Sequence, residues 1–323
     1  MLENKKIGIV IPCYKVKNQI NSVISKIENF VDVIYLVDDK CPEKSGEFIS
    51  QNNHDPRIKV IFNEKNLGVG GAVKEGYKMG LKEGCDILVK VDGDDQMDPR
   101  LIKYLIQPIL KGEADYVKGN RFYKLEDLKS MPMIRLIGNS VLSFINKAVN
   151  GYWNIMDPTN GFTAIHKHSL SQLPLNKIEN RYFFESDMLF RLGLIRAVVV
   201  DFPIVAVYRD EESSLRIGKI LFEFPPKYLK RFIKRIFYNY ILREFNVGSL
   251  QLLMGSLLIG FSFIFGVIKW VASIQHGIPA SPGTVMVAAL PFFLGFQLLL
   301  SALYFDISNL PKKPLSSQEM NEY

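Results

Sequence analysis

"VKVDGDDQMDP", residues 89–99, places four carboxylates within seven positions at the end of the apolar run "CDILVKV" (85–91): Asp92, Asp94, Asp95 and Asp98. Like charges this close repel one another and raise one another's pKa unless a positive group lies among them. A divalent cation is the simplest such group, so the stretch predicts a metal site at the end of a strand. A solvated turn is the alternative, because Asp and Gly are common turn residues. The stretch alone does not separate the two.

The chain around it, from about residue 5 to 120, alternates strand-like and helix-like runs. The strand-like runs are "KIGIVIP", "VIYLVDD", "IKVIF", "CDILVKV" and "ADYVKG", and the runs near 17–30, 43–51, 69–84 and 99–111 have helical patterns. This alternation predicts an α/β fold with a mainly parallel, Rossmann-like sheet covered by helices on both faces. In such sheets ligands bind beyond the carboxyl ends of the strands. The polar clusters "PCYK", "DDKCP", "NEKNLGVGG" and "DGDDQ" fall at those ends.

Composition suggests that part of the chain is not soluble. Of its 323 residues 48% are hydrophobic, and its mean hydropathy is slightly above zero. The net charge of +7 suggests a polyanionic partner. The three cysteines, Cys13, Cys41 and Cys85, lack the spacing of a zinc site or a disulfide framework. The N-terminus shows no apolar segment of signal-peptide length, so the first domain is expected in the cytoplasm.

The C-terminal third predicts a membrane anchor. Residues 225–245 read as a basic amphipathic helix on an anionic membrane surface, with an ordinary surface helix or a nucleic-acid-binding helix as alternatives. The apolar stretches 247–272 and 284–305 are each long enough to span a bilayer, which makes a nucleic-acid partner unnecessary. Basic residues precede the first span and follow the second, so both termini are expected in the cytoplasm, with the chain in the cytoplasmic (inner) membrane.

We therefore divide the chain into four parts: a cytoplasmic α/β domain (1–220), a basic juxtamembrane segment (221–246), a transmembrane hairpin (247–306) and a cytoplasmic tail (307–323). Small residues in the spans, among them Gly255, Gly260 and Gly266, permit close helix packing, so a homo-oligomer is plausible.

The spacing Asp92-Gly93-Asp94 suits one ion, because residues i and i+2 of an extended turn point to the same side. Gln96 can add a neutral oxygen. Mg²⁺ and Mn²⁺ prefer such oxygen ligands and bridge carboxylates to phosphates, so a phosphate-bearing substrate is expected. Three other phosphate or metal motifs are excluded by their missing residues: the P-loop, the dinucleotide-binding glycine pattern and the aspartate-rich Ca²⁺ loop.

Seven ordered motifs carry a resemblance to a known family: "VIPCYK" (10–15), "VDD" (37–39), "NLGVGGA" (66–72), "DGDDQ" (92–96), "GNR" (119–121), "NGF" (160–162) and "FFESD" (183–187). In order and spacing they resemble family 2 inverting glycosyltransferases with the GT-A fold. The chain is similar in particular to the polyprenyl-phosphate glycosyltransferases, such as the dolichyl-phosphate mannose synthases and the GtrB-like proteins, in which this domain precedes membrane helices.

The resemblance implies a role for each matching residue. Pro12 and Tyr14 would line the nucleotide pocket, and Asp38 or Asp39 would bond the base or ribose. The ligands of Mg²⁺ or Mn²⁺ on the donor diphosphate would be Asp92, Asp94 and Gln96. The acceptor phosphate would lie against Arg121, Arg135 and Asn139. A loop containing Arg209, Ser213 and Arg216 would close over the donor, and the catalytic candidates are Asp94, Arg121 and Asp187.

Several of these residues have ordinary structural alternatives. Arg121 and Arg135 are also typical surface ion-pair residues. Asp38 can cap the following helix. Glu185 and Asp187 lie in an apolar stretch, where a carboxylate serves structural pairing as readily as catalysis. Asp157 and Asn160, in "DPTNGF", look like turn residues.

The expected activity is metal-dependent, inverting transfer of a sugar from a nucleotide-sugar to a polyisoprenyl phosphate of the undecaprenyl type. A phosphate acceptor is already ionised near neutral pH and needs positioning more than a base, whereas a sugar hydroxyl would need a carboxylate such as Asp187. Two alternatives stay open. One is transfer to another membrane lipid or lipid-linked oligosaccharide, and the other is an inactive membrane scaffold that binds nucleotide-sugar.

Overall fold

A computed structural model of the chain describes residues 2–123, 133–204 and 217–317. It divides into two compact units. The sheet unit comprises Met1–Phe232 and Pro311–Tyr323, and the hairpin unit comprises Ile233–Leu310. The structure thus groups the start of the juxtamembrane segment, and the segment that follows the hairpin, with the sheet.

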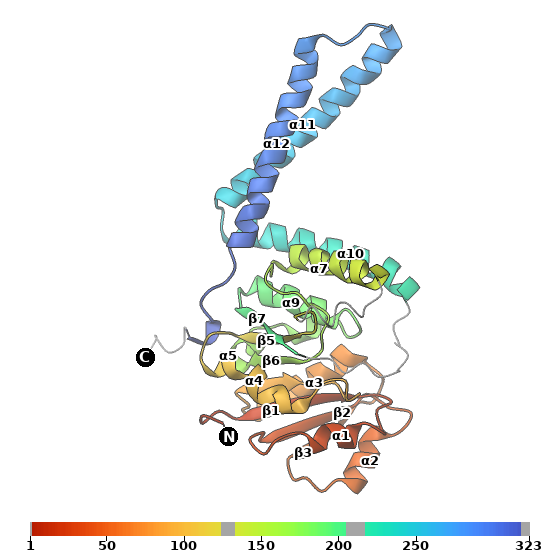
Figure 1. Cartoon of the computed structure of the whole chain (residues 1–323), viewed down its shortest axis with the longest axis vertical. Coiled ribbons are helices and arrows are strands. Elements are labelled where there is room, and N and C mark those ends of the chain that lie inside the picture. The colour runs from red at the N-terminus through yellow and green to blue at the C-terminus, as the bar shows by residue number, and fades with distance from the viewer. Residues whose placement is uncertain (1, 124–132, 205–216, 318–323) are drawn as a thin grey trace. The chain divides into compact units, whose positions relative to one another are not determined.

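A seven-stranded sheet forms the centre of the sheet unit, in the order β3-β2-β1-β4-β6-β5-β7 (Figure 1). Its strands are β1 (Ile7–Cys13), β2 (Val33–Asp38), β3 (Ile58–Phe62), β4 (Ile87–Lys90), β5 (Tyr116–Asn120), β6 (Thr163–His166) and β7 (Val199–Pro203). β6 is antiparallel to both of its neighbours, and the other pairs are parallel. The predicted mainly parallel α/β sheet is confirmed, and the carboxyl ends of six strands meet at one edge.

Helices cover both faces of this sheet. On one face α1 (Ile20–Ser25) and α4 (Ile102–Leu105) pack against β1 in one buried apolar cluster. On the other lies α3 (Val69–Lys82), whose Gly76 fits against the side chain of Val10. The central strands are nearly continuous apolar runs, as expected of strands buried on both sides.

The predicted helix at 99–111 is broken into three short pieces: η1 (Pro99–Leu101), α4 and α5 (Gln107–Leu110). Pro108 explains the last break, because proline has no N–H to continue the helical hydrogen bonds from the preceding turn. Further short helices are α2 (Ser45–Asn52), α8 (Lys167–Ser171), η2 (Leu175–Lys177) and η4 (Leu315–Ser317).

Three longer helices that follow β5 in the chain pack together: α7 (Met133–Asn150), α9 (Phe184–Leu194) and α10 (Ile217–Ile236). Figure 1 shows α7 beside α10. An aromatic cluster joins them, in which the Phe183 ring lies 4.9 Å from that of Tyr228 and 5.1 Å from that of Phe224. The Tyr228 hydroxyl also accepts from Asn146 Nδ2 on α7 at 2.9 Å.

The hairpin unit consists of α11 (Val247–His276) and α12 (Pro282–Ser308), preceded by a π-helical turn, η3 (Phe237–Arg243). Both long helices are apolar and long enough to cross a membrane, and few of their side chains are buried. They extend a few residues beyond the predicted spans. Gly255 and Gly295 face each other where the helices approach closely, and a side chain on either would meet the other's backbone.

Candidate active site

The carboxylates of the opening stretch separate into two groups in the structure. Asp95, with a left-handed φ of 59°, turns into the protein and binds Lys26 at 2.6 Å and the Ser22 hydroxyl at 2.9 Å. Asp98 caps η1 through the N–H of Arg100. Asp92 and Asp94 lie half-buried beyond the end of β4. Asp95 and Asp98 thus have structural roles, and Asp92 and Asp94 are the candidates for a ligand.

Asp92 is held by a lysine from its own strand. Lys90 Nζ lies 2.7 Å from Asp92 Oδ1 and 3.3 Å from Glu185 Oε1 on α9, and it donates to the Gly161 carbonyl at 3.2 Å. The Lys90 side chain is only 1% exposed. Burial alone would lower the pKa of Lys90, but the carboxylates of Asp92 and Glu185 outweigh it and raise that pKa above its ordinary value. Lys90 is therefore a permanent buried cation.

The turn through Gly93 passes over the end of β1. A Cβ on Gly93 would lie 3.4 Å from the Pro12 carbonyl oxygen, so the Asp92-Gly93-Asp94 segment and the predicted nucleotide-pocket residue Pro12 are neighbours. Tyr14, one residue beyond β1, is 46% exposed. This edge of the sheet thus brings together Pro12, Asp92 and Asp94, with an exposed aromatic ring close by along the chain.

Asp38 and Asp39 at the end of β2 are both buried and hold loops in place. Asp38 accepts from the N–H groups of Cys41 and Gly46, each at 2.7 Å, and so fixes the entry to α2. Asp39 accepts from Asn63 Nδ2 and from the N–H groups of Leu67 and Gly68. The capping alternative for Asp38 describes these contacts, and Asp39 shapes the "NLGVGGA" loop.

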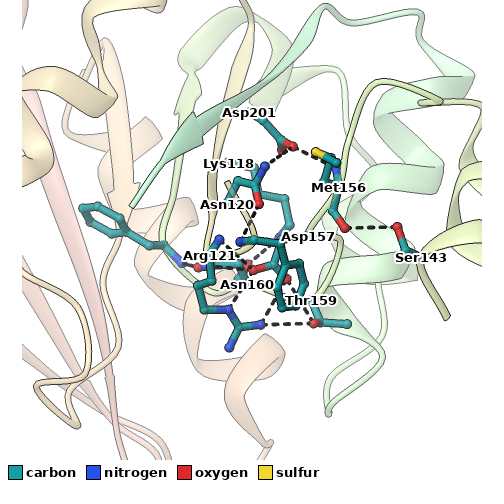
Figure 2. A network of polar contacts seen from close by, with 11 residues as sticks. Lys118, Asn120, Arg121, Ser143, Met156, Asp157, Thr159, Asn160 and Asp201 are labelled. Carbon is teal, nitrogen blue, oxygen red and sulfur yellow. Dashed lines mark hydrogen bonds and ion pairs between the residues drawn. The ribbon is translucent and has the colours of Figure 1, made fainter. Parts of the chain in front are cut away.

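Arg121, directly after β5, forms a two-pronged ion pair with Asp157 (Figure 2). Its Nε lies 2.7 Å from Asp157 Oδ2, and its Nη2 lies 3.0 Å from Oδ1. Asp157 is fully buried. Burial raises the pKa of its carboxyl group, but the Arg121 guanidinium lowers that pKa by more, so the net pKa is below the ordinary value. Arg121 itself keeps 23% of its side chain exposed.

A second buried lysine supports the same loop. Lys118 on β5 donates to the Asn160 carbonyl, next to the Gly161 carbonyl that Lys90 binds. Lys90 and Lys118 both pair with Thr163 of β6, one from each side, so they flank that strand in register. Burial lowers the pKa of Lys118 to about 8. Residues 157–161 therefore join the Asp92 end of the edge to the Arg121 end.

Asp201 on β7 completes the network drawn in Figure 2. Its Oδ2 accepts from Asn120 Nδ2 at 3.0 Å and from the Met156 N–H at 2.8 Å. Among the described residues its buried Oδ1 has no hydrogen-bond partner. Burial raises the pKa of Asp201 to about 6.

Asp187, expected as a catalytic candidate, is fully buried between two arginines. Its Oδ2 lies 3.2 Å from Arg191 Nε, and its Oδ1 lies 2.9 Å from Arg231 Nε on α10. It also accepts from the Glu179 N–H at 3.0 Å. These contacts match the structural alternative, and it is Glu185, two residues earlier, that reaches the Asp92 end of the edge.

Five expected site residues cannot be placed. Arg209 lies outside the described residues, as do Ser213 and Arg216. Arg135 and Asn139 belong to α7, but their side chains are outside the described part of the structure.

The basic residues of α10 are not all directed at a membrane. Lys227 and Arg231 pair with Glu179 at 3.0 and 3.1 Å. Arg235, in the hairpin unit, pairs with Asp306 at 2.7 Å. Lys230 and Lys234 are exposed, together with apolar side chains such as Leu229.

The residues at the strand ends fit a hard divalent cation, provided that a substrate completes the site. Within the described ranges, no group of three or more His, Cys, Asp and Glu side chains is able to hold a metal alone. Asp92, Asp94 and Gln96 supply only oxygen ligands, are half-buried and lie at the sheet edge where ligands bind. Such an incomplete oxygen set suits Mg²⁺ or Mn²⁺ shared with a diphosphate.

The sequence did not predict the roles of Lys90 and Lys118, or that the loop 157–161 joins the two ends of the sheet edge. The available signal was a lysine inside an otherwise apolar strand, in "ILVK" and again in "YVKGN". A charge at a buried strand position requires a partner, although the sequence does not say which one.

Known proteins resemble this chain in sequence and in fold. Residues 8–173 match the model of the family described as "Glycosyl transferase family 2". The UDP-N-acetylglucosamine–dolichyl-phosphate N-acetylglucosaminyltransferase of Methanococcus voltae is 30% identical over 223 residues, which are 65% of this chain and 88% of that protein. The undecaprenyl-phosphate mannosyltransferase of Micrococcus luteus is 28% identical over 219 residues, 66% of this chain and 88% of that protein.

Among solved structures, glucosyl-3-phosphoglycerate synthase from Mycobacterium tuberculosis, crystallised with Mn²⁺, UDP and its product, has a similar fold. The TM-score is 0.52 at 20% identity, over 72% of this chain and 80% of that one. The sheet is thus a GT-A fold. The chain belongs to glycosyl transferase family 2 and is a glycosyltransferase.

Proposed function

We propose that this glycosyltransferase transfers a sugar from a nucleotide-sugar to a polyisoprenyl phosphate at the cytoplasmic face of a membrane. The observation that carries the proposal is the placement, on one sheet edge, of two sets of side chains whose chemistry suits phosphate groups. Asp92 and Asp94 lie at the end of β4, Arg121 lies at the end of β5, and the loop 157–161 contacts both ends through Lys90 and Asp157. The first set suits a donor diphosphate and the second an acceptor phosphate.

The relatives and the hairpin support a lipid acceptor. The printed names of the Methanococcus voltae and Micrococcus luteus proteins specify dolichyl and undecaprenyl phosphate. Two helices of this chain are long and apolar enough to cross a bilayer. In the sheet unit α7 and α10 also expose apolar side chains, including Val141, Phe144 and Leu229. Such a face is typical of contact with the membrane surface.

Different residues of the chain would bind the metal ion, the donor and the acceptor. Asp92, Asp94 and Gln96 would hold Mg²⁺ or Mn²⁺, which would neutralise the charge that develops on the departing nucleoside diphosphate. Pro12 and Tyr14 would line the nucleotide pocket, whose loops Asp38 and Asp39 hold in place. Arg121, whose side chain is partly exposed, would orient the acceptor phosphate, with Arg135 and Asn139 as further candidates. Arg209 remains a candidate for closing over the donor.

The acceptor phosphate would attack without help from a base. A phosphate monoester is largely ionised near neutral pH. Asp187, enclosed by two arginines, is then a structural carboxylate. A single displacement inverts the anomeric centre, so an α-linked donor gives a β-linked lipid-phosphate sugar.

A mass-spectrometric transfer assay tests the proposal. The full chain in detergent is given undecaprenyl phosphate, Mg²⁺ or Mn²⁺, and UDP-, GDP- and dTDP-sugars in turn, with and without chelator. We expect a lipid-phosphate sugar with one donor class, and no product with chelator. Release of nucleoside diphosphate without lipid product would refute the acceptor and favour a hydroxyl on another lipid. Consumption of no donor would favour the nucleotide-sugar-binding scaffold.

A further inference from the structure

We infer that Lys90 and Glu185 are positioning residues of the donor site, which together fix the place of the Asp92 carboxylate. The inference rests on the proposed function, because it assigns Asp92 to the donor. Lys90, Asp92 and Glu185 are called the clamp below. It joins three distant segments: the end of β4, the loop at Gly161 and the first turn of α9.

Lys90 acts through Asp92 and not on a substrate. An ammonium group has three N–H donors. Lys90 has three acceptors in reach, namely Asp92 Oδ1 at 2.7 Å, Glu185 Oε1 at 3.3 Å and the Gly161 carbonyl at 3.2 Å. Its side chain is almost entirely enclosed. No donor is left over for a sugar or a phosphate.

The charges of the clamp explain why a lysine is needed. Asp92 and Glu185 have 26% and 12% of their side chains exposed, so water screens them poorly. Without a cation between them, the carboxylates of Asp92 and Glu185 would repel each other, and Asp92 would move away from its place. With Lys90 present the clamp carries one net negative charge, which leaves Asp92 attractive to a metal ion.

The surroundings keep the clamp in one geometry. Gly161 is packed so closely that a Cβ there would collide with both Asp92 Oδ2 and Lys90 Nζ. Glu185 lies on α9. Asp187, two residues after Glu185, pairs with Arg231 and so holds α9 against α10. The carboxylate of Asp92 is therefore tied to a rigid helix and not only to its own turn.

A charge-balanced double variant tests the clamp. Lys90→Met changes its net charge from −1 to −2, Glu185→Gln changes it to 0, and the double variant returns it to −1. We measure Mn²⁺ binding by the full chain in detergent, without donor or lipid, from the electron paramagnetic resonance of free Mn²⁺. Unfolding midpoints and donor KM and kcat are measured in parallel.

We expect Glu185→Gln to weaken Mn²⁺ binding about tenfold, the effect of a close charge pair, and the double variant to recover most of it. Lys90→Met should lower kcat/KM by about a hundredfold, mainly through KM for the donor, and adding Glu185→Gln should recover at least about tenfold. The matched control is the exposed pair of Lys44 and Glu47, 3.0 Å apart, whose Met and Gln variants should leave every readout unchanged.

The inference is overturned if the double variant binds Mn²⁺ as weakly as Glu185→Gln, or if Lys90→Met keeps the wild-type kcat/KM. Should Lys90→Met fail to fold, the comparison of Glu185→Gln with the double variant decides. If the wild-type chain binds no Mn²⁺, the metal part of the proposed function fails. The clamp is then judged by whether Glu185→Gln restores the unfolding midpoint that Lys90→Met lowers.

Discussion

Asp94 stands four residues from Asp98, yet the two carboxylates have different environments. Asp94 is half-buried at the sheet edge, while Asp98 caps a short helix and pairs with Arg100 at 2.8 Å. This contrast allows a test within one turn of the chain, because the two residues share chemistry and neighbourhood but not the proposed role.

Asp94→Ala should therefore abolish transfer while leaving the fold intact. Loss of a metal ligand removes stabilisation of charge on the leaving diphosphate, so we expect kcat to fall by about 10²–10³ or more. Asp98→Ala should keep near wild-type kcat and lose only about 1 kcal/mol of stability with the cap. The transfer assay and thermal unfolding measure both. Wild-type activity in Asp94→Ala would remove that residue from the site.

Asp201 gives a pH-dependent prediction. Its pKa is raised from about 3.8 in the unfolded chain to about 6 in the folded one. The folded state therefore binds more protons between these values, and the stability that the protonated carboxyl contributes is lost as pH rises through 6. Asp201→Asn cannot titrate. The free energy of unfolding of the variant minus that of wild type should rise by up to about 3 kcal/mol from pH 4 to pH 7.

Denaturant unfolding at several pH values measures this difference. A constant difference across the range would mean that Asp201 ionises like an exposed carboxylate. The comparison is unaffected by other titrating groups, since they are common to both proteins.

The sequence predicted the residues at the strand ends better than their partners. Strand-end aspartates follow from local pattern, since polar residues after an apolar run mark the carboxyl edge of a parallel sheet. Lys90 links Asp92 to Glu185, and Asp187 pairs with Arg231, both of which lie far along the chain. No local pattern reports which distant helix packs there, so the structural role of Asp187 could not be distinguished from catalysis.

At the scale of elements, α9 connects the site to the juxtamembrane helix. Glu185 faces β4, while Asp187 faces α10 and Glu179 pairs with the same Arg231. The aromatic cluster of Phe183, Phe224 and Tyr228 fills the space between. The amphipathic pattern of α10 predicted a helix correctly. The pattern favoured a membrane surface as the partner of its basic residues, but it did not predict that Lys227 and Arg231 form ion pairs within the protein.

Arg231→Met should destabilise the sheet unit strongly. It leaves the enclosed Asp187 with Arg191 alone, and breaking a buried ion pair typically costs about 3–5 kcal/mol. Lys230→Met, on the exposed side of the same helix, should change stability by less than about 0.5 kcal/mol. Thermal unfolding followed by circular dichroism compares them. Equal effects would contradict the ion-pair role of Arg231.

Asp187→Asn separates a structural carboxylate from a base. We expect a lower unfolding midpoint but a kcat within a few-fold of wild type for the folded protein. Loss of a general base would instead lower kcat by about 10²–10⁴. Activity measured well below the unfolding midpoint, with the folded fraction determined on the same sample, decides between them.

At the scale of the whole molecule, the segment after the hairpin returns to the sheet unit. The N–H groups of Leu315 and Ser316 donate to the buried Asp115 at 2.9 and 3.1 Å, just before β5 begins. If α11 and α12 both cross the bilayer, the two ends of the hairpin must lie on the side of the sheet unit. This agrees with the orientation expected from the charge pattern.

Cysteine labelling tests that orientation. The native cysteines are buried, so Ile278→Cys in the α11–α12 connection and Lys312→Cys after α12 each provide one exposed thiol. A membrane-impermeant maleimide should label residue 278 in intact cells and residue 312 only after lysis. Labelling of 312 in intact cells, with 278 protected, would reverse the topology.

Asp115 lies in the first half of the chain, but two of the N–H groups that donate to it follow the hairpin, so these contacts form only after synthesis has passed through the hairpin. A nascent chain that inserted one span but not the other would leave residues 311–317 across the bilayer from Asp115, with a buried carboxylate short of two donors. The turn at Leu315–Ser317 thus couples completion of the sheet unit to correct insertion of the hairpin. A wrongly inserted molecule would have an incomplete sheet unit, and incomplete domains are degraded by proteases.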